Sequence, residues 1–181
     1  MTNVYIITAD YLHNFLNINE NTSDVIVKRE ILKAQELDLM PTLGENLYNK
    51  IISDIEGGTL AGNYLTLVNN YVAKYLAYSA YVRLLINGSY KFANGNLYRS
   101  QSENSEALDV GYLRSIKKEY EGDRDTYEKR LIDYLCYNSG NFPEYMNNNS
   151  DQVKSHKDTL FGGISITNYV KLPAEKRSSK N

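Results

Sequence analysis

The residues of this sequence that could carry chemistry are few and widely spaced. Of its two histidines, His13 lies near the start and His156 in the last part of the chain, so they are poor candidates for a shared zinc site. The single cysteine, Cys136, follows Leu135 on the apolar side of a helical stretch, where a cysteine is typically a small buried hydrophobe. We therefore expect no metal ion.

The acidic residues also fail to form a catalytic pattern. Asp123 and Asp125 flank Arg124 and resemble a metal-binding or acid–base pair only superficially. On a charged helix face such side chains are solvated or form local ion pairs, such as Asp125 with Lys129. The sequence has no phosphate-binding loop, no His-Glu-x-x-His, no Gly-x-Ser-x-Gly and no Gly-x-Gly-x-x-Gly. We expect neither an enzyme nor a cofactor.

Charge and composition exclude further classes. The 181 residues include 20 Lys and Arg against 22 Asp and Glu, a net charge of −2, so the whole chain is not drawn to nucleic acid or to an anionic membrane. No stretch is apolar enough to span a bilayer, and the first residues lack the basic region of a signal peptide. These features predict a soluble protein made inside the cell.

Helix signals dominate the first 145 residues. Thr8 is placed to cap a first helix, Thr22 or Ser23 to cap a second, and Pro41 to end the second near Met40 and open the third. Gly57 and Gly58 end the third helix. The five predicted helices cover about residues 8–16, 23–40, 41–56, 62–87 and 108–137.

The helix predicted over residues 62–87 is the core element of this arrangement. Its stripe of apolar and tyrosine side chains is unbroken, and its only charges are Lys74 and Arg83. A helix that is apolar nearly all round is buried by its neighbours or by other copies of the chain. Tyrosine has an apolar ring and a polar tip, so some of these side chains suit an interface.

The remaining residues predict a hairpin and an arm. Asn94-Gly95 between two short strand-like runs favours a β-hairpin over about residues 89–100. Residues 146–181 show no sustained period, and the end of the chain is predicted to be mobile. The predicted fold is all-α: a bundle of about five helices with a β-hairpin insertion, forming a domain over 1–145, and an extended C-terminal arm over 146–181.

Two sets of residues are predicted to meet partners. Apolar and aromatic side chains of the hairpin and of a small apolar island in the arm are candidates for contacts between subunits. They are Tyr90, Phe92, Leu97, Tyr98, Leu160, Phe161, Ile164 and Ile166. Residues 151–181 hold six basic and three acidic side chains, so the arm can also reach an acidic surface or a phosphate backbone. The basic candidates are Lys171, Lys176, Arg177 and Lys180.

The order of several short motifs resembles a known family. These motifs are Pro-Thr-Leu-Gly-Glu-Asn-Leu-Tyr at 41–48, Tyr-Leu-Arg-Ser-Ile-Lys-Lys-Glu-Tyr at 112–120, Arg-Leu-Ile-Asp-Tyr-Leu-Cys-Tyr-Asn at 130–138, Phe-Pro-Glu-Tyr at 142–145 and Phe-Gly-Gly-Ile at 161–164. Together with the tyrosine-rich helix they resemble head–tail connector proteins, also called adaptor or ring proteins, of tailed bacteriophages, in particular of crAss-like phages that infect Bacteroides.

The resemblance implies a structural role in the virion. Copies of the chain would form a twelve-fold ring at the head–tail interface beneath the portal protein, extend the channel for double-stranded DNA without binding a specific sequence, and dock a neighbouring tail or connector protein. The protein would be found in the virion and, during assembly, in the host cytoplasm, with no membrane partner and no catalytic residues.

Three alternatives stay open at the level of sequence. A stopper or tail-completion protein differs from a connector in the virion part that it binds. A cytoplasmic helical regulator would bind nucleic acid through the basic arm, although the acidic body argues against it. An enzyme of unknown type has no supporting group of residues in the sequence.

Overall fold

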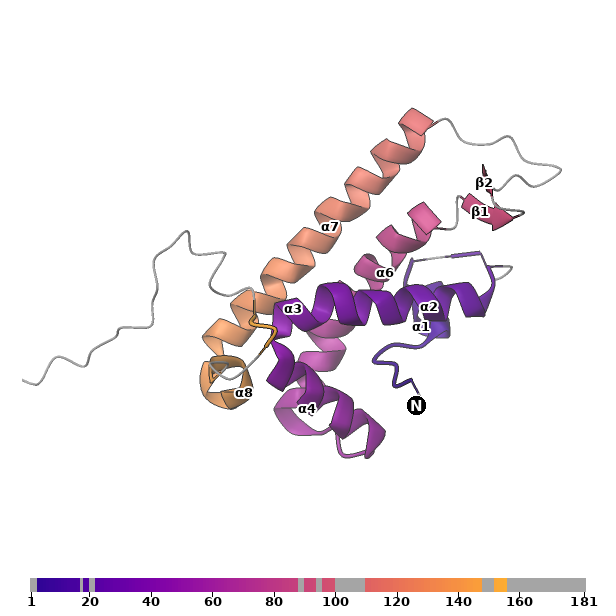
Figure 1. Cartoon of the computed structure of the whole chain (residues 1–181). Coiled ribbons are helices and arrows are strands. Elements are labelled where there is room, and N and C mark those ends of the chain that lie inside the picture. Colours follow the sequence, from indigo (N-terminus) through magenta and orange to yellow (C-terminus); the bar gives the residue numbers. More distant parts are fainter. Residues whose placement is uncertain are drawn as a thin grey trace, which may run out of the picture.

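The computed structural model describes residues 3–16, 18–19, 22–87, 90–93, 96–99, 110–147 and 152–155 (Figure 1). Six helical segments make up the body. They are α1 (Ala9–Leu16); α2 (Asp24–Ala34) continued by the π-helical turn η1 (Gln35–Leu39) and α3 (Met40–Leu43); α4 (Glu45–Glu56); α5 (Gly62–Leu67) continued by the π-helical turn η2 (Val68–Val72) and α6 (Ala73–Asn87); α7 (Val110–Tyr137); and, after the 3₁₀ turn η3 (Ser139–Asn141), α8 (Pro143–Met146).

The start of the chain is fixed by two side chains. The Thr8 hydroxyl accepts a hydrogen bond of 3.0 Å from the backbone N–H of Tyr11, which confirms the predicted cap of α1. Buried Gln35 uses both ends of its amide: its Oε1 accepts from the Ile6 backbone N–H at 2.9 Å, and its Nε2 donates to the Val4 carbonyl oxygen at 3.1 Å. The N-terminal segment is therefore attached to η1.

The predicted helix boundary at Met40 is wrong. The helix that begins at Asp24 runs through Pro41 and ends at Leu43. A proline inside a helix removes a hydrogen-bond donor, and its ring clashes with the carbonyl four residues earlier. The π-helical turn η1 lies immediately before Pro41 and alters the hydrogen-bond ladder there, with the Met40 N–H bonding to the Gln35 carbonyl oxygen. This local widening explains how the helix continues.

Gly44, and not Pro41, separates this helix from α4. Its backbone has φ +80° and ψ 155°, a conformation that is essentially restricted to glycine. Helix α4 then runs to Glu56 and ends at Gly57 and Gly58, as predicted. The α4 residues Leu47 and Ile51 are fully buried.

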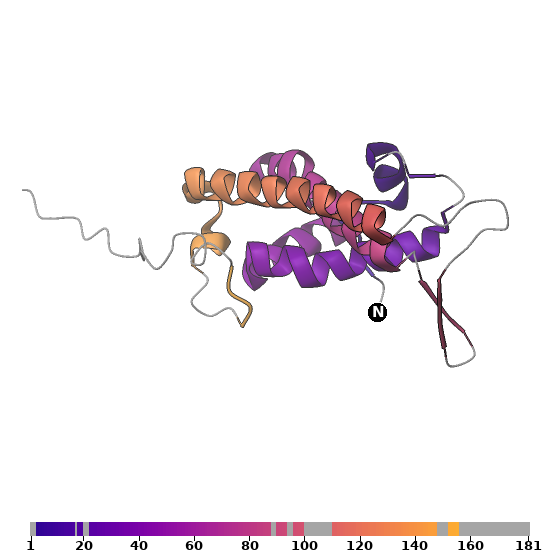
Figure 2. The same ribbon diagram turned by 90° about the horizontal axis from the view of Figure 1, so that it is seen from above.

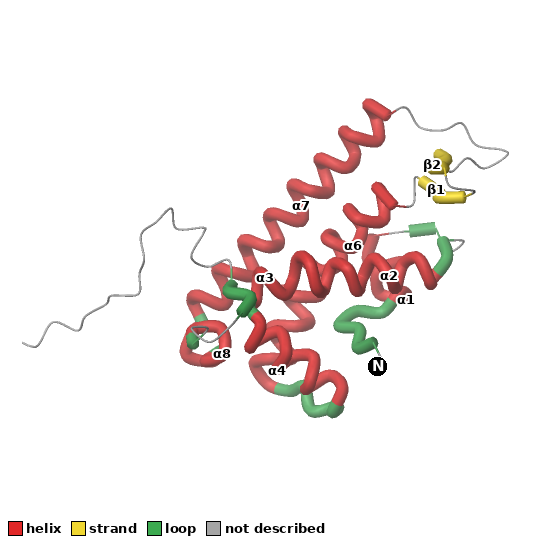
Figure 3. Tube along the Cα trace, viewed as in Figure 1, coloured by secondary structure: helices red, strands yellow, loops and turns green. Residues whose placement is uncertain are grey.

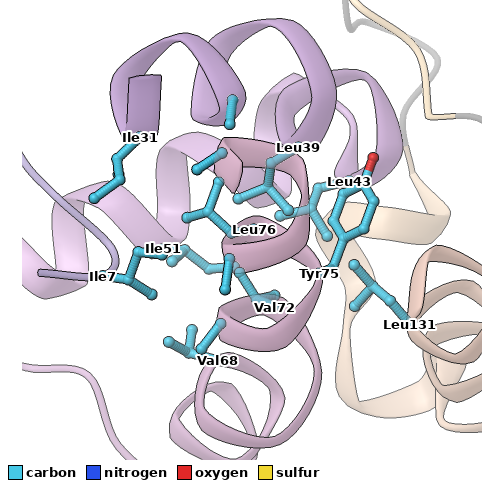
Figure 4. Close-up of a cluster of buried hydrophobic side chains, with 14 of the residues drawn as sticks. Ile7, Ile31, Leu39, Leu43, Ile51, Val68, Val72, Tyr75, Leu76 and Leu131 are labelled. Carbon is cyan, nitrogen blue, oxygen red and sulfur yellow. The ribbon is translucent and has the colours of Figure 1, made fainter. Parts of the chain in front are cut away.

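Helix α6 is the central element of the core. The continuous helix from Gly62 to Asn87 matches its predicted span, and α6 packs against α1, α2 and α7. Figure 4 shows Val68, Val72 and Leu76 pointing from η2 and α6 toward the apolar side chains of the surrounding helices. Those labelled around them are Ile7, Ile31, Leu39, Leu43, Ile51 and Leu131.

Helix α7 is the longest element, and α8 follows it by a short turn. In the view of Figure 3 the first turns of α7 reach beyond the last turn of α6. Helix α8 was not predicted. Its Tyr145 and the preceding Phe142 are fully buried, so the short helix closes one end of the core.

Within the described part of the chain, no helix is long and apolar enough to cross a membrane.

The predicted fold class needs correction. We predicted about five helices with a β-hairpin insertion. The described body consists of six helices, because α8 adds one, and this body contains no strand. Strands β1 (Tyr90–Ala93) and β2 (Asn96–Arg99) pair only with each other, and Figure 2 shows them projecting away from the helices. The predicted turn at 94–95 lies outside the described residues, as does most of the predicted arm over 146–181.

Candidate interaction surface

Six aromatic side chains from three helices form what we call the aromatic cluster. Its members are Tyr11, Phe15, Tyr78, Tyr81, Tyr120 and Tyr127. Every one of them is half-buried, so each ring has one side against the protein and another accessible to solvent. With six members, the cluster is the largest set of contacting aromatic rings among the described residues.

The rings contact one another in a chain across the three helices. Tyr78 stacks on Tyr127 with ring centroids 5.1 Å apart, and meets Phe15 edge-on at 5.8 Å. Tyr81 and Tyr120 meet edge-on at 4.6 Å. These are the favoured geometries for aromatic pairs, each of which contributes about 0.5–1.5 kcal/mol beyond the area it buries. The cluster is therefore ordered by its own contacts.

Helical spacing explains why these rings share one side of the molecule. Tyr78 and Tyr81 lie three residues apart on α6, and Tyr120 and Tyr127 lie seven apart on α7, so each pair falls on one helix face. Helix α1 brings its two rings to the same side because buried Leu12 attaches it to the core. The cluster thus depends on how α1, α6 and α7 pack together.

The pKa values of three tyrosines of the cluster are raised. Burial raises the pKa of Tyr78 above its ordinary value of 10.0, and nearby Asp123 raises it further. Burial and then Tyr120 raise the pKa of Tyr81 in the same way, and burial followed by Tyr127 raises that of Tyr11. Neutral phenols are weak nucleophiles, but their rings and hydroxyls suit a protein contact.

Much of α7 is left uncovered by the other described parts of the chain. From Gly111 to Arg130 no residue is buried, and the first fully buried side chain is Leu131. The apolar residues Leu113 and Ile116 are only half-buried, and Tyr112 is exposed. A helix with this pattern has an apolar stripe that its own core leaves open. The stripe continues directly into the aromatic cluster.

Local ion pairs lie on the same part of α7. Lys117 pairs with Glu121 at 2.9 Å, and Arg124 pairs with Asp125 at 2.7 Å. Asp125 is thus bound by Arg124 and not by Lys129, the partner that we predicted. These contacts join neighbours along one helix, and exposed pairs of this kind stabilise a protein by at most about 1 kcal/mol. They do not anchor α7 to the body.

A polar network behind the aromatic cluster does anchor α7. Arg83 of α6 donates to both carboxylate oxygens of Asp38 in η1, at 2.8 and 2.6 Å. The hydroxyl of Thr42 lies 2.9 Å from the Asp38 carbonyl oxygen, 3.1 Å from Oε1 of Glu128 on α7 and 3.3 Å from the Tyr75 hydroxyl. Burial raises the pKa of Tyr75, so this phenol is neutral. The network therefore links η1, α3, α6 and α7.

A buried carboxylate joins α2 to the end of α6. Glu30 is fully buried, and its oxygens accept hydrogen bonds from Asn87 at 2.7 Å, Arg29 at 3.0 Å and Lys33 at 3.1 Å. Burial alone would raise the pKa of the Glu30 carboxyl, but these three donors outweigh it and hold the pKa below its ordinary value of 4.5. The charged form is therefore the one that the fold stabilises.

This shift predicts how stability responds to acid. A carboxyl whose pKa is lowered by folding contributes stability above pH 4.5, and that contribution is lost as the pH falls through the lower, folded value. We expect Glu30→Gln to lower the free energy of unfolding at neutral pH by about 1–3 kcal/mol. We also expect the variant to lose less stability than the wild type on acidification, in urea titrations at neutral and acidic pH. Parallel stability–pH curves would contradict this prediction.

The described residues include one of the two histidines and the single cysteine. Among them there is no group of three His, Cys, Asp or Glu side chains that could hold a metal ion. His13 lies with Nδ1 3.3 Å from the Ile18 carbonyl oxygen and Nε2 3.6 Å from Asp24, and Cys136 is a half-buried free cysteine. His156 lies outside the described residues.

The predicted contact residues cannot be placed on this surface. The hairpin residues lie on β1 and β2, whose side chains are not described, and the arm residues lie outside the described part of the chain. The first group is Tyr90, Phe92, Leu97 and Tyr98; the second is Leu160, Phe161, Ile164, Ile166, Lys171, Lys176, Arg177 and Lys180. The sequence predicted the tyrosine stripe of the helix over 62–87 but not its pairing with rings of α7, for which the 78/81 and 120/127 spacings were the available signal.

The fold and this surface define an α-helical protein with an aromatic face formed by α1, α6 and α7. Residues 39–155 match DUF6712, a family of unknown function, and the chain belongs to this family. The match covers α3 to α8 and therefore both long helices that carry the surface. No curated protein and no solved structure matches the chain.

Proposed function

We propose that this protein is a structural virion protein that forms a ring at the head–tail interface of a tailed phage, beneath the portal. In this role copies of the chain contact one another side by side, extend the channel for double-stranded DNA and dock the next tail component. The protein works as an assembled ring in the virion and is present in the host cytoplasm during assembly. It carries out no reaction.

The observation that supports this proposal best is the open face formed by α7 and the aromatic cluster. Twenty consecutive residues of α7, Gly111 to Arg130, include no buried side chain, and the six rings of the aromatic cluster, two of which belong to this stretch, are half-buried. Exposure of such an apolar stripe to water is unfavourable in free energy, and contact with a neighbouring subunit would remove the stripe from water. Tyrosine is enriched at protein interfaces for the same reason.

One of the motifs that resemble those of phage connectors lies in this face, and three others lie elsewhere in the described body. Residues 112–120 belong to the open part of α7, residues 130–138 cover its last turns and Asn138 beyond it, and 41–48 spans the junction of α3 and α4. Residues 142–145 supply Phe142 and Tyr145, which are buried against the end of the bundle. The net charge of −2 also suits a channel that lets DNA pass without holding it.

The test is to mix the purified protein with the portal oligomer of its phage and to image the mixture by negative-stain electron microscopy. Light scattering gives the mass of each component alone. We expect an added annular layer on the portal. A compact monomer that does not bind the portal would overturn the proposal. In that case, binding to a tail component would indicate a stopper or tail-completion protein. A salt-sensitive gel-mobility shift of duplex DNA would indicate a nucleic-acid-binding regulator.

A substitution on the open face tests which surface makes the contact. Tyr120 contacts the rings of Tyr78 and Tyr81 and is half-buried, so Tyr120→Ser removes two aromatic contacts from the face. We expect assembly on the portal to require about tenfold more protein, equivalent to about 1.4 kcal/mol, with an unchanged helical circular dichroism spectrum. Sedimentation of portal mixtures over a concentration series measures this shift.

The matched control is Tyr137→Ser, at the other end of the same helix. Tyr137 is 91% exposed and lies outside the aromatic cluster, so its loss should leave assembly on the portal unchanged. If the two variants assemble equally well, the face around Tyr120 is not the contact between subunits.

A further inference from the structure

A hollow of ≈ 390 Å³ lies between the N-terminal segment, the α2–η1 helix and α4. Its lining includes the apolar side chains Val4, Leu32 and Ile52, which are half-buried, and the buried ring of Tyr48. The same lining contains two exposed carboxylates, Glu36 and Glu56. Within the described residues neither carboxylate takes part in an ion pair. The hollow therefore combines an apolar surface with two free negative charges.

The last described residues of the chain are attached to the N-terminal end of α4, one of the helices that line this hollow. The Glu45 backbone N–H donates to the Val153 carbonyl oxygen at 3.0 Å, and the Glu45 carboxylate accepts from the Gln152 backbone N–H at 2.9 Å. Ser155 is buried. These contacts hold residues 152–155 at the N-terminal end of α4, so the rest of the chain starts from there.

The attachment point and the hollow share one face of α4. Glu45, Tyr48, Ile52 and Glu56 follow one another at intervals of three, four and four residues, which places them on a single helix face. At 1.5 Å per residue, Ile52 lies about 10 Å along the helix from Glu45. The five residues from Ser155 to Leu160 can span about 17 Å when extended. The apolar island at 160–166 is therefore within reach.

The chemistry of this island complements that of the hollow. Residues 160–166 contain Leu160, Phe161, Ile164 and Ile166; Lys157 and Asp158 precede them, and Lys171 follows them. The segment from 157 to 171 therefore has an apolar centre and two lysines against one aspartate, which complements an apolar lining with two carboxylates. Because the segment is tethered by a few residues, its effective concentration at the hollow reaches the millimolar range. Weak contacts are then sufficient for docking.

We infer that residues 160–166 dock into the hollow between the N-terminal segment, α2–η1 and α4 of the same copy of the chain. Their apolar side chains cover Val4, Leu32 and Ile52, while Lys171 approaches the carboxylates of Glu36 and Glu56. The docked segment also covers the N-terminal segment that Gln35 holds. This inference does not depend on the connector proposal, because it concerns one chain alone.

Disulfide trapping in the full-length protein tests the inference. The double variant Glu56→Cys and Phe161→Cys is made in a Cys136→Ser background, oxidised mildly and run on a non-reducing gel. We expect a crosslink within one chain, seen as a monomer of altered mobility that reverts on reduction. The control pairs Phe161→Cys with Ser115→Cys, an exposed position on α7, and should give no crosslink within the chain.

A second measurement detects docking without cysteines. The double variant Phe161→Ser and Ile164→Ser should increase hydrogen–deuterium exchange severalfold at the backbone amides of residues 3–7, whereas Lys176→Ser should not. A disulfide that links two chains would show that residues 160–166 of a second copy fill the hollow. The absence of any crosslink, together with unchanged hydrogen–deuterium exchange, would show that this segment does not dock into the hollow. Either result overturns the inference.

Discussion

Leu39→Ala is expected to lower the free energy of unfolding by about 2–5 kcal/mol, measured by urea denaturation. Leu39 lies in η1, is fully buried and points into the core around Leu76 (Figure 4). Truncation removes apolar contacts and leaves a cavity that the neighbouring helices fill only in part. A domain of this size is stable by only about 5–15 kcal/mol, so the variant would lose a large part of its stability.

Leu37→Ala is the matched control for this variant. Leu37 belongs to the same π-helical turn, only two residues away, but it is 59% exposed. The same chemical change should therefore alter the stability of the isolated chain by no more than about 0.5 kcal/mol. Equal losses in the two variants would mean that η1 is placed differently and that Leu39 does not face the core.

Gly44→Ala has the second-largest expected effect, a loss of about 1–3 kcal/mol in the free energy of unfolding. The φ of +80° and ψ of 155° at this position are sterically closed to residues with a Cβ atom. An alanine either bears this strain or shifts the junction between α3 and α4, and both outcomes disturb buried Leu43 and Leu47. Thermal unfolding followed by circular dichroism measures the loss.

Gly122→Ala provides the opposite expectation within the same protein. Gly122 lies in the middle of α7, is exposed, and an added Cβ would meet no atom within 4 Å. Alanine is the better helix former by about 0.8–1.0 kcal/mol, so we expect this variant to be slightly more stable than the wild type, or at least to keep α7 helical at higher temperature. If Gly44→Ala were also neutral, the strained junction would not exist.

The helices were largely predictable because their ends carry strong local signals. Thr8 does cap α1, Gly57 and Gly58 do end α4, and the helix from Gly62 to Asn87 has the predicted span. The boundary at Pro41 was wrong because the π-helical turn before it arises from packing, which no local rule foresees. Helix α8 is only four residues long, too short for a periodic signal.

The aromatic cluster shows where sequence reasoning reaches its limit. Each tyrosine stripe follows from spacing along one helix, so the stripes on α6 and α7 could be predicted. The pairing of Tyr78 with Tyr127 depends on the register between two helices that are far apart in the sequence. Thr42 of α3 contacts both Tyr75 of α6 and Glu128 of α7, so this register also involves a third helix. No single segment contains this information.

The uneven burial of α7 divides the helix into two thermodynamic parts. Its last turns, around Leu131 and Leu135, belong to the core and open only when the whole domain unfolds. Its first twenty residues rest on rings and polar contacts, so they can open and close locally at a much smaller cost. A neighbouring molecule that binds the first turns of α7 would therefore order that part of the helix alone. The stability of the core would be the same with and without the bound neighbour.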